Sequence, residues 1–375
     1  MKTRPIFRFF CFLLCACFLL SACGEEIVET PQEETVSIWF VDGALLSAEL
    51  RTLSEQFNSA SFPVKTELRA FADEAELGAA LDSARPDLIL CGHERAVSLY
   101  EENRLGDVST GFSQPPAYNE SFLALSDCVG CAFFPIGAET ELLAVNGTAF
   151  ESSEAGALGP NSLSTLDGLC AAAAACGQQG QVFFTADSFT ALFAAALGPL
   201  GSGFSGLREQ DMLSEDYKRV YNLLAEAAYE GGIAAYDSAA LPLVKSGEPV
   251  CALVASTGLA GEQDGNLSFC PMPGVSGSLA RAVGLAVTTP FSGREQTVAR
   301  FLSWLLQPRR AADLALSRGL IPAIGGWAPE EPGGVETALL SLSEEMLYFP
   351  PLDSGFFRSD GEFEHRFRAA LEMLK

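Results

Sequence analysis

The chain has 375 residues, a hydrophobic content of 48% and a formal net charge of −25 at pH 7. This length is enough for two lobes, each with a core of its own. A surface this acidic repels phosphate backbones, so we exclude nucleic acid as a partner.

The first 22 residues have the pattern of a bacterial secretion signal. Cations near the N-terminus precede an apolar stretch over residues 9–20, which at about a dozen residues is too short to span a bilayer comfortably. Small residues then lead to Cys23 in the order Leu-Ser-Ala-Cys. This segment resembles the bacterial lipobox, which implies that residues 1–22 are a signal peptide and that Cys23 carries a membrane-anchoring lipid. An uncleaved anchor helix and a chance cysteine are the alternatives.

The segment after Cys23 has the composition of a tether. Residues 24–35 are rich in glutamate, contain one proline and show no apolar periodicity. Such a segment stays solvated and does not fold on its own. We therefore expect residues 23–35 to form an acidic tether and the globular part to begin at Val36.

Strands and helices alternate from residue 36 to residue 105. The apolar run over residues 36–41 indicates a strand covered on both faces, and the spacing of apolar residues from Leu46 to Phe57 indicates a helix. The same patterns predict two further strands and two further helices: strands over 64–70 and 87–91, and helices over 73–83 and 94–105. Such alternation is typical of a parallel α/β sheet.

The alternation continues in the second half of the chain. We expect strands over 142–145, 250–254 and 284–288, and helices over 164–176, 189–198, 213–229, 298–305 and 363–374. Pro308 should stop the helix at 298–305. Residues 201–206 match the pattern GxGxxG, but they follow a helix, where a dinucleotide-binding loop follows a strand. We interpret them as a flexible loop.

The cysteines and histidines argue against catalysis. Seven cysteines follow Cys23, and Cys128 with Cys131 forms the only CxxC motif. This motif does not open a helix after a strand, as a redox motif should, and no second ligand pair accompanies it. A local disulfide and two free thiols both remain open, and we expect no metal. With only two histidines and no nucleophile elbow, we expect neither enzyme activity nor a cofactor.

Four segments carry a family resemblance. They are VSIWFVDG at residues 36–43, RPDLILCGHERAVSLYEENRLGDVS at 85–109, FFPIGAETELLAVNG at 133–147, and the stretch from VGLAV to LIPAI at 283–324. In this order they resemble the extracellular solute-binding proteins of ABC importers, most closely the carbohydrate-binding family that includes maltose-binding protein. Gly92-His93-Glu94-Arg95 resembles the Ala-His-Asp-Arg loop of the maltose branch, and Glu139 falls on an acidic position of the family.

The resemblance implies an α/β fold of the type II periplasmic-binding-protein kind, with two lobes and a hinge between them. Three crossovers are expected near 137–140, 271–274 and 321–325. Lobe one would contain residues 36–138 and 275–322, and lobe two would contain residues 139–274 and 323–375. Ligands of open parallel sheets bind beyond the carboxyl ends of the strands, which agrees with a cleft between the lobes.

Eight residues are candidates for binding a ligand in this cleft. Sugar hydroxyls require groups that donate and accept hydrogen bonds, and sugar C–H faces require aromatic platforms. The candidates are Asp42, His93, Glu94, Arg95, Glu139, Ser256, Thr257 and Trp327. Asp42 could instead cap a helix, Glu94 could stabilise a helix start, Arg95 could cover surface, and Trp39 is a core residue rather than a platform.

Three departures from the family affect the choice of solute. Cys91, Val145 and residues 256–259 stand where the family carries aromatic side chains, so maltodextrin is disfavoured. We expect a monomeric extracytoplasmic lipoprotein, anchored to the cell membrane, that captures a small solute, most typically a carbohydrate, for the permease of an ABC transporter. The alternative is a ligand-sensing or interaction lipoprotein on the same scaffold.

Overall fold

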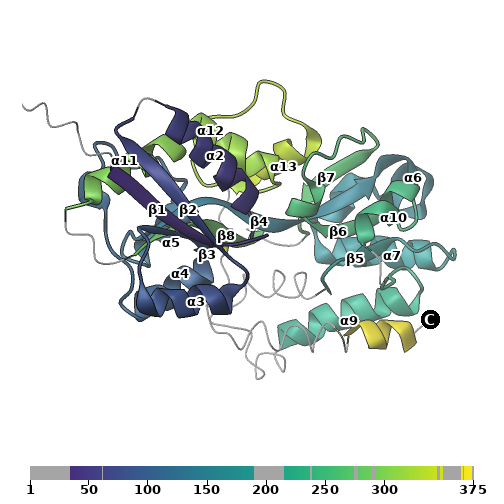
Figure 1. Cartoon of the computed structure of the whole chain (residues 1–375). Helices are drawn as coiled ribbons and strands as arrows, with labels where there is room; N and C mark the ends of the chain where they lie inside the picture. The colour runs from purple at the N-terminus through teal and green to yellow at the C-terminus, as the bar shows by residue number, and fades with distance from the viewer. Residues whose placement is uncertain are drawn as a thin grey trace, which may run out of the picture. The chain divides into compact units, whose positions relative to one another are not determined.

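The structure is a computed structural model that describes residues 34–60, 62–189, 215–236, 239–273, 278–288, 293–343, 347–348, 365 and 367–373 (Figure 1). Its contacts divide the chain into Met1–Glu34 and a compact unit, Thr35–Lys375. The signal segment, Cys23, most of the helix expected at 189–198 and the glycine loop at 201–206 lie outside the described residues. Among those that are described, no helix combines the length and apolar character needed to cross a membrane.

Ten strands of the described chain form one sheet, whose central path has the order β2-β1-β3-β8-β4-β6-β5. The strands are β1 (Glu34–Val41), β2 (Val64–Phe71), β3 (Leu88–Gly92), β4 (Phe133–Asn146), β5 (Phe184–Ala186), β6 (Cys251–Ala255), β7 (Leu267–Pro271), β8 (Ser278–Val287), β9 (Ile321–Pro322) and β10 (Leu347–Tyr348). β1 pairs with β3, and β5 with β6, in parallel, as expected. β8 and β4 are antiparallel to their neighbours on this path. The sheet is therefore mixed rather than parallel throughout.

β4 connects the two parts of the sheet. Its first half, from Phe133 to Thr140, pairs with β8, and Gly137 and Ala138 also pair with β9. Its second half, from Glu141 onward, pairs with β6 and β7. One continuous strand thus changes partners at the position where the sequence resemblance places the first crossover.

The helices cover both faces of the sheet (Figure 1). They are α2 (Ser47–Ser59), α3 (Glu74–Ser83), α4 (His93–Glu101), α5 (Glu120–Asp127), α6 (Gly147–Ser152), α7 (Leu166–Gly177), α9 (Glu215–Tyr229), α10 (Ala240–Ser246), α11 (Glu295–Leu305), α12 (Pro308–Ser317) and α13 (Gly334–Ser343). Residues 367–373 are also helical. α2, α11 and α12 pack on one face of β1 and β3, and α3 and α4 on the other.

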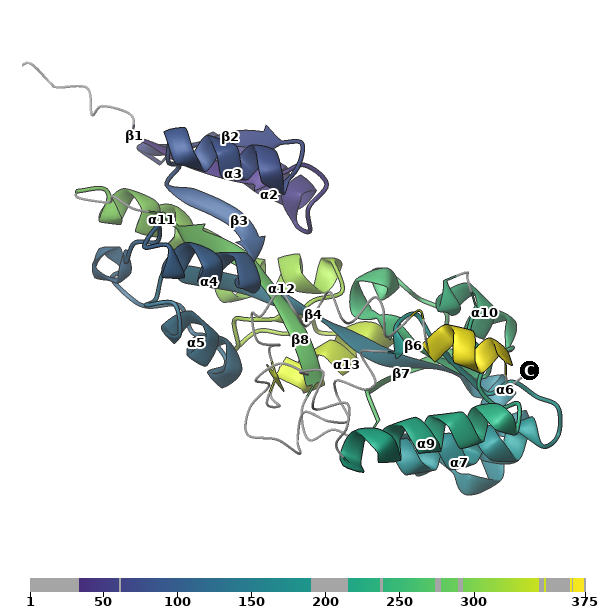
Figure 2. The same cartoon turned by 90° about the horizontal axis from the view of Figure 1, so that it is seen from below.

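The described residues form three hydrophobic core clusters. Phe40, Phe57 and Phe301 lie in the cluster under α2 and α11. A second cluster joins β3 to α3, α4 and α5, and continues along β4 to α13. The third contains Phe184 and Leu224 and lies where α7 packs beside α9 (Figure 2). Most apolar positions of the predicted helices in the described chain are buried in these clusters, which explains why periodicity located them.

One helix ends earlier than predicted. The expected helix over 94–105 stops at Glu101, because Asn103 has a left-handed backbone with φ 56°. The N–H of Arg104 donates to the carbonyl of Leu99, and the N–H of Asn103 donates to that of Tyr100. This is the Schellman arrangement, in which asparagine can replace glycine. The apolar Leu105 then forms a bridge with Thr288 and is not helical.

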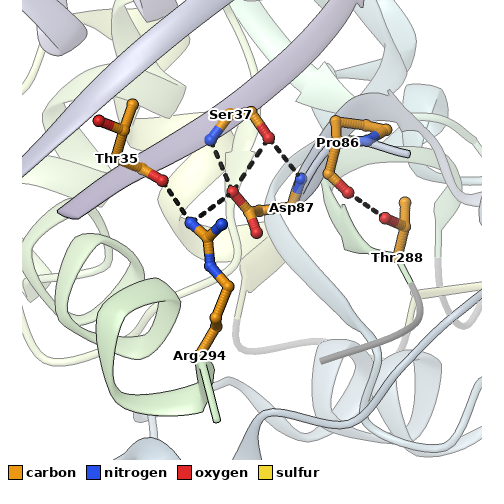
Figure 3. Close-up of polar contacts among 6 residues, drawn as sticks. All are labelled: Thr35, Ser37, Pro86, Asp87, Thr288 and Arg294. Carbon is orange, nitrogen blue, oxygen red and sulfur yellow. Dashed lines mark hydrogen bonds and ion pairs between the residues drawn. The ribbon is translucent and has the colours of Figure 1, made fainter. Parts of the chain in front are cut away.

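A buried carboxylate holds the start of β1 (Figure 3). The Asp87 Oδ2 atom accepts hydrogen bonds from Ser37 N at 2.7 Å, from Ser37 Oγ at 3.0 Å and from Arg294 Nη2 at 3.0 Å. Arg294 also donates to the carbonyl oxygen of Thr35. Because the Asp87 side chain is only 9% exposed, these donors compensate a charge that water hardly reaches. The network fastens the first strand to β3 and α11.

Candidate functional site

The carboxyl ends of β1 and β3 meet at one edge of the sheet. Trp39 is opposite Ile89 in the parallel register, so both strands end side by side. Gly92 at the end of β3 is opposite Val283 of β8, and Val283 is opposite Gly137 of β4 on its other side. This edge therefore lies beside the point where β4 changes partners, and it brings the predicted segments at Asp42, at the start of α4 and at Glu139 into one region.

Glu139 is held by two partners from different elements. Thr257 Oγ1 donates to Glu139 Oε1 at 2.5 Å, and Arg281 Nη2 lies 2.9 Å from Glu139 Oε2. Arg281 is opposite Glu139 in the antiparallel register of β4 and β8. The Glu139 side chain is 20% exposed and that of Arg281 is 49% exposed. This carboxylate–guanidinium–hydroxyl cluster combines donors and acceptors that remain partly open to solvent.

Ser256 helps to hold this cluster in place. It begins the short 3-10 helix η6 (Ser256–Leu259), it is fully buried, and its Oγ accepts a hydrogen bond from Thr140 N at 3.1 Å. Gly319, which follows α12, lies against the Ser256 backbone with φ +68°. The contact of Gly319 with η6 and the bond to Thr140 fix the place of Thr257, which carries the hydroxyl that reaches Glu139.

Asp42 does not cap α2. The N-cap residue is Leu46, and it makes no side-chain capping hydrogen bond. Asp42 Oδ1 instead lies 2.8 Å from Arg51 Nη2, within an exposed ion pair. The capping alternative is therefore wrong, and the carboxylate of Asp42 already has a cation beside it.

The three predicted residues at the start of α4 have different surroundings. His93 is buried, its Nε2 lies 3.4 Å from Cys128 Sγ, and its ring packs against Phe133 with a centroid separation of 5.7 Å. Glu94 occupies the first turn and is half-buried. Arg95 is also half-buried, and its Nε is a buried donor without a hydrogen-bond partner among the described residues.

Burial of His93 makes the fold sensitive to pH. It lowers the pKa of the imidazole to about 4, below the value of about 6.5 in an unfolded chain. The unfolded state therefore binds the proton first, so stability present above pH 6.5 should be lost as the pH falls toward 4. We expect protonation linked to His93 to lower the free energy of unfolding by about 2 kcal/mol between pH 7.5 and pH 5.

Urea unfolding at both pH values would measure this loss. The difference should shrink in His93→Gln, while exposed carboxylates titrate equally in both proteins. His365→Gln, which changes the other histidine at an exposed position, should behave as the wild type. Equal pH dependence of the wild type and His93→Gln would contradict the expectation.

The aromatic candidates lie close to the core. Trp327 is half-buried and packs against the cluster that contains β3 and β4. Trp39 is 7% exposed and its ring lies 5.0 Å from that of Phe71, so it is a core residue, as expected. Tyr118 was not predicted; its hydroxyl is buried without a hydrogen-bond partner among the described residues.

Three further features bear on what the site can hold. A groove of about 640 Å³ lies between α2 and α12, and none of the eight predicted residues lines it. Within the described part of the chain, no three His, Cys, Asp or Glu side chains are grouped so that they could hold a metal ion. Cys128 and Cys131 are free thiols, so the local disulfide is absent in this structure.

The fold and this edge define the class of protein: a two-lobed α/β solute-binding fold of the periplasmic type. The sequence profile described as "Bacterial extracellular solute-binding protein" matches residues 52–335. The chain belongs to this family, whose members bind solutes extracellularly for transport and are not enzymes. No curated protein sequence matches the chain.

Solved structures share the fold at low sequence identity. The cyclic α-maltosyl-1,6-maltose binding protein of Arthrobacter globiformis is 16% identical with a TM-score of 0.69, covering 91% of this chain and 94% of that one. A probable secreted solute-binding lipoprotein of Streptomyces coelicolor is 17% identical with a TM-score of 0.66, covering 91% and 98%. The spermidine/putrescine ABC transporter substrate-binding protein of Streptococcus pneumoniae is 13% identical with a TM-score of 0.63, covering 90% and 99%.

Proposed function

We propose that this protein captures a small carbohydrate at the edge described above and delivers it to the permease of an ABC importer. The observation that carries the proposal is the Glu139–Arg281–Thr257 cluster. Sugar hydroxyls both donate and accept hydrogen bonds, and a buried polar group left without a partner costs about 1–3 kcal/mol. A carboxylate, a guanidinium and a hydroxyl side by side provide both kinds of partner to such a ligand.

The pairing of charges favours a sugar over a polyamine. A polyamine would need carboxylates that are not already compensated. Here Arg51 accompanies Asp42, and Arg281 accompanies Glu139. One similar structure is named as a spermidine/putrescine-binding protein, and another is named as a binding protein for a maltose-type sugar. The fold itself therefore does not discriminate between these ligands.

We assign the lobes and the remaining contacts as part of the same proposal. Lobe one comprises residues 36–138 and 275–322, and lobe two comprises residues 139–274 and 323–375; the change of partners along β4 supports this division. Asp42, Glu94, Arg95 and Trp327 would surround the ligand together with the Glu139 cluster. His93 and Ser256 would act by positioning their neighbours, since both are buried.

The anchor is proposed from the N-terminal sequence. Lys2, Arg4 and Arg8 precede the apolar stretch, and the lipobox-like order ends at Cys23. Two or more acyl chains would hold the protein stably at the membrane. One structure with the same fold is named as a probable secreted lipoprotein. Mass spectrometry of the membrane-extracted protein should find a lipid on an N-terminal Cys23, and a Cys23→Ser variant should not carry it.

Thermal unfolding against a ligand panel tests the proposal. The chain from residue 24 retains the whole compact unit, and the panel would contain glucose, galactose, maltose, lactose and spermidine. A ligand at one hundred times its dissociation constant should add roughly 2.7 kcal/mol, which raises the melting temperature by several degrees at this size. A shift with spermidine alone would overturn the carbohydrate proposal.

For the sugar that gives the largest shift, Glu139→Gln should weaken binding about 100-fold, or about 2–3 kcal/mol, because charged hydrogen bonds are lost around the ligand. Isothermal titration would measure this change. Asp167→Asn is the matched control: Asp167 also pairs with an arginine, Arg219 at 2.6 Å, but on the exposed surface of α7 and α9. Equal affinities of both variants and the wild type would exclude the Glu139 cluster as the binding site.

A sensing or interaction lipoprotein on the same scaffold is the second candidate. It is favoured by Cys91 and Val145, which are buried small side chains where the family carries aromatic residues. This candidate predicts no melting shift with any sugar or polyamine of the panel.

A further inference from the structure

The turn after α5 contains two cysteines three residues apart. The N–H of Cys131 donates to the carbonyl of Ser126, and the N–H of Gly130 donates to that of Asp127. With Gly130 at φ +63°, this is the Schellman arrangement that ends a helix. Cys128 is the C-cap residue directly after α5, and Cys131 follows Gly130, so one tight turn of backbone joins the two residues.

These two thiols are also accessible. Cys128 is exposed and Cys131 is half-buried. Among the other cysteines of the described chain, Cys270 is half-buried in β7, and the remaining four are buried: Cys91, Cys170, Cys176 and Cys251. Cys128 and Cys131 are thus the pair that a soluble oxidant can reach and that the backbone brings together.

Each sulfur has a different polar neighbour in the reduced state. Cys128 Sγ donates to the carbonyl of Leu125 at 3.0 Å and lies 3.4 Å from His93 Nε2. Cys131 Sγ lies 3.5 Å from Asp127 Oδ1. A bond between the two sulfurs would remove the thiol hydrogen of Cys128 beside the ring of His93, so the state of the pair is coupled to the first residue of α4.

We propose that Cys128 and Cys131 are a modification site that closes into a reversible local disulfide when a disulfide-bearing thiol oxidant is present. One thiolate attacks a sulfur of the oxidant, forms a mixed disulfide and releases one reduced thiol. The second thiolate attacks the protein sulfur of that mixed disulfide and releases the second. Two electrons pass from the cysteines to the oxidant, and the two protons of the cysteines leave with the released thiols.

The surroundings of the thiols make the closed form persistent. Cys128 is exposed as a residue, but its sulfur contacts are partly buried, and this desolvation raises its pKa, with a further contribution from Asp127. Partial burial together with the hydrogen bond to Asp127 raises the pKa of Cys131. A thiol of high pKa is rarely present as the attacking thiolate at neutral pH. It is also a poor leaving group when its disulfide is reduced. The pair should therefore form its bond slowly and also lose it slowly.

Oxidised glutathione is the probe for the first test. After incubation with it, the chain from residue 24 should lose two hydrogens in intact mass, and peptide mapping should place the bond between Cys128 and Cys131. Cys128→Ser or Cys131→Ser should instead retain one glutathione on the remaining thiol. Cys270→Ser, which removes the other half-buried thiol, should behave as the wild type.

The imidazole signals provide the second test, because the chain from residue 24 contains only two histidines. On oxidation, the ring resonances of His93 should shift, while those of His365 should not; His365→Gln assigns them. A wild-type protein that retains two glutathiones, or that keeps its original mass, or a disulfide that leaves the His93 signals unchanged, would overturn the proposal.

Discussion

Replacing Gly319 with alanine should destabilise the fold by about 2–4 kcal/mol. A Cβ at this position would collide with the carbonyl oxygen of Ser256 and would lie 2.8 Å from its carbonyl carbon, so η6 and the turn after α12 must separate. Overpacking of this kind costs roughly 1–3 kcal/mol, and the left-handed backbone at φ +68° adds about 1 kcal/mol for a residue with a side chain. Urea unfolding would measure the loss.

The same change should weaken ligand binding, because η6 carries Thr257 and Thr257 donates to Glu139. Gly326→Ala is the matched control. Gly326 has a similar backbone, φ +85°, but a Cβ added there would have nothing within 4 Å of it, so only the backbone penalty of about 1 kcal/mol should remain. If both variants lost the same stability, the contact between Gly319 and η6 would not matter to the fold.

Replacing Asp87 with alanine should cost about 2–3 kcal/mol of unfolding free energy. The change leaves Ser37 N–H, the Ser37 hydroxyl and one Arg294 donor without their acceptor at a site that water hardly reaches (Figure 3). Removing one partner of a buried network costs more stability than the network contributed. The remaining donors then have hydrogen bonds neither to the protein nor to water. Denaturant unfolding would show a lower midpoint with an unchanged slope.

Asp82→Ala controls for the loss of a carboxylate that binds an arginine. Asp82 Oδ1 also lies close to a guanidinium, 2.7 Å from Arg104 Nη2, but its side chain is 68% exposed. Exposed pairs contribute less than about 1 kcal/mol, so this variant should unfold almost as the wild type does. A loss as large as that of Asp87→Ala would show that burial is not the cause.

Apolar periodicity predicted most of the elements that the described residues contain. It located β1, α2, β3 and α11 because their apolar positions are buried in the core. It could not locate α10 or α13, because their short or uniformly apolar sequences have weak periodicity. It also could not locate the end of α4, because the left-handed backbone at Asn103 ends the helix although the apolar pattern continues. Pro308 was correctly taken to stop α11, but it also starts α12, because proline suits the first helical position.

The candidate site was less accessible to sequence reasoning. Glu139 and Thr257 were predicted separately, and the structure joins them through a hydrogen bond. Arg281 was missed, because its role depends on being opposite Glu139 across two strands far apart in the chain. Arg281 could have been predicted only from the pairing register of β4 and β8. Ser256 was also predicted, and the structure shows that its buried hydroxyl accepts a hydrogen bond from the backbone of Thr140.

The way in which the chain enters the fold has a mechanical consequence. Any pull on the segment ahead of Thr35 arrives through β1, which lies between β2 and β3 in the sheet. A pull directed along the strand loads its inter-strand hydrogen bonds together, in shear, instead of peeling them one at a time. The Asp87 network sits where this load first enters. A receptor held to a surface by its N-terminus, as we propose, is thereby attached through a strand suited to resist extension.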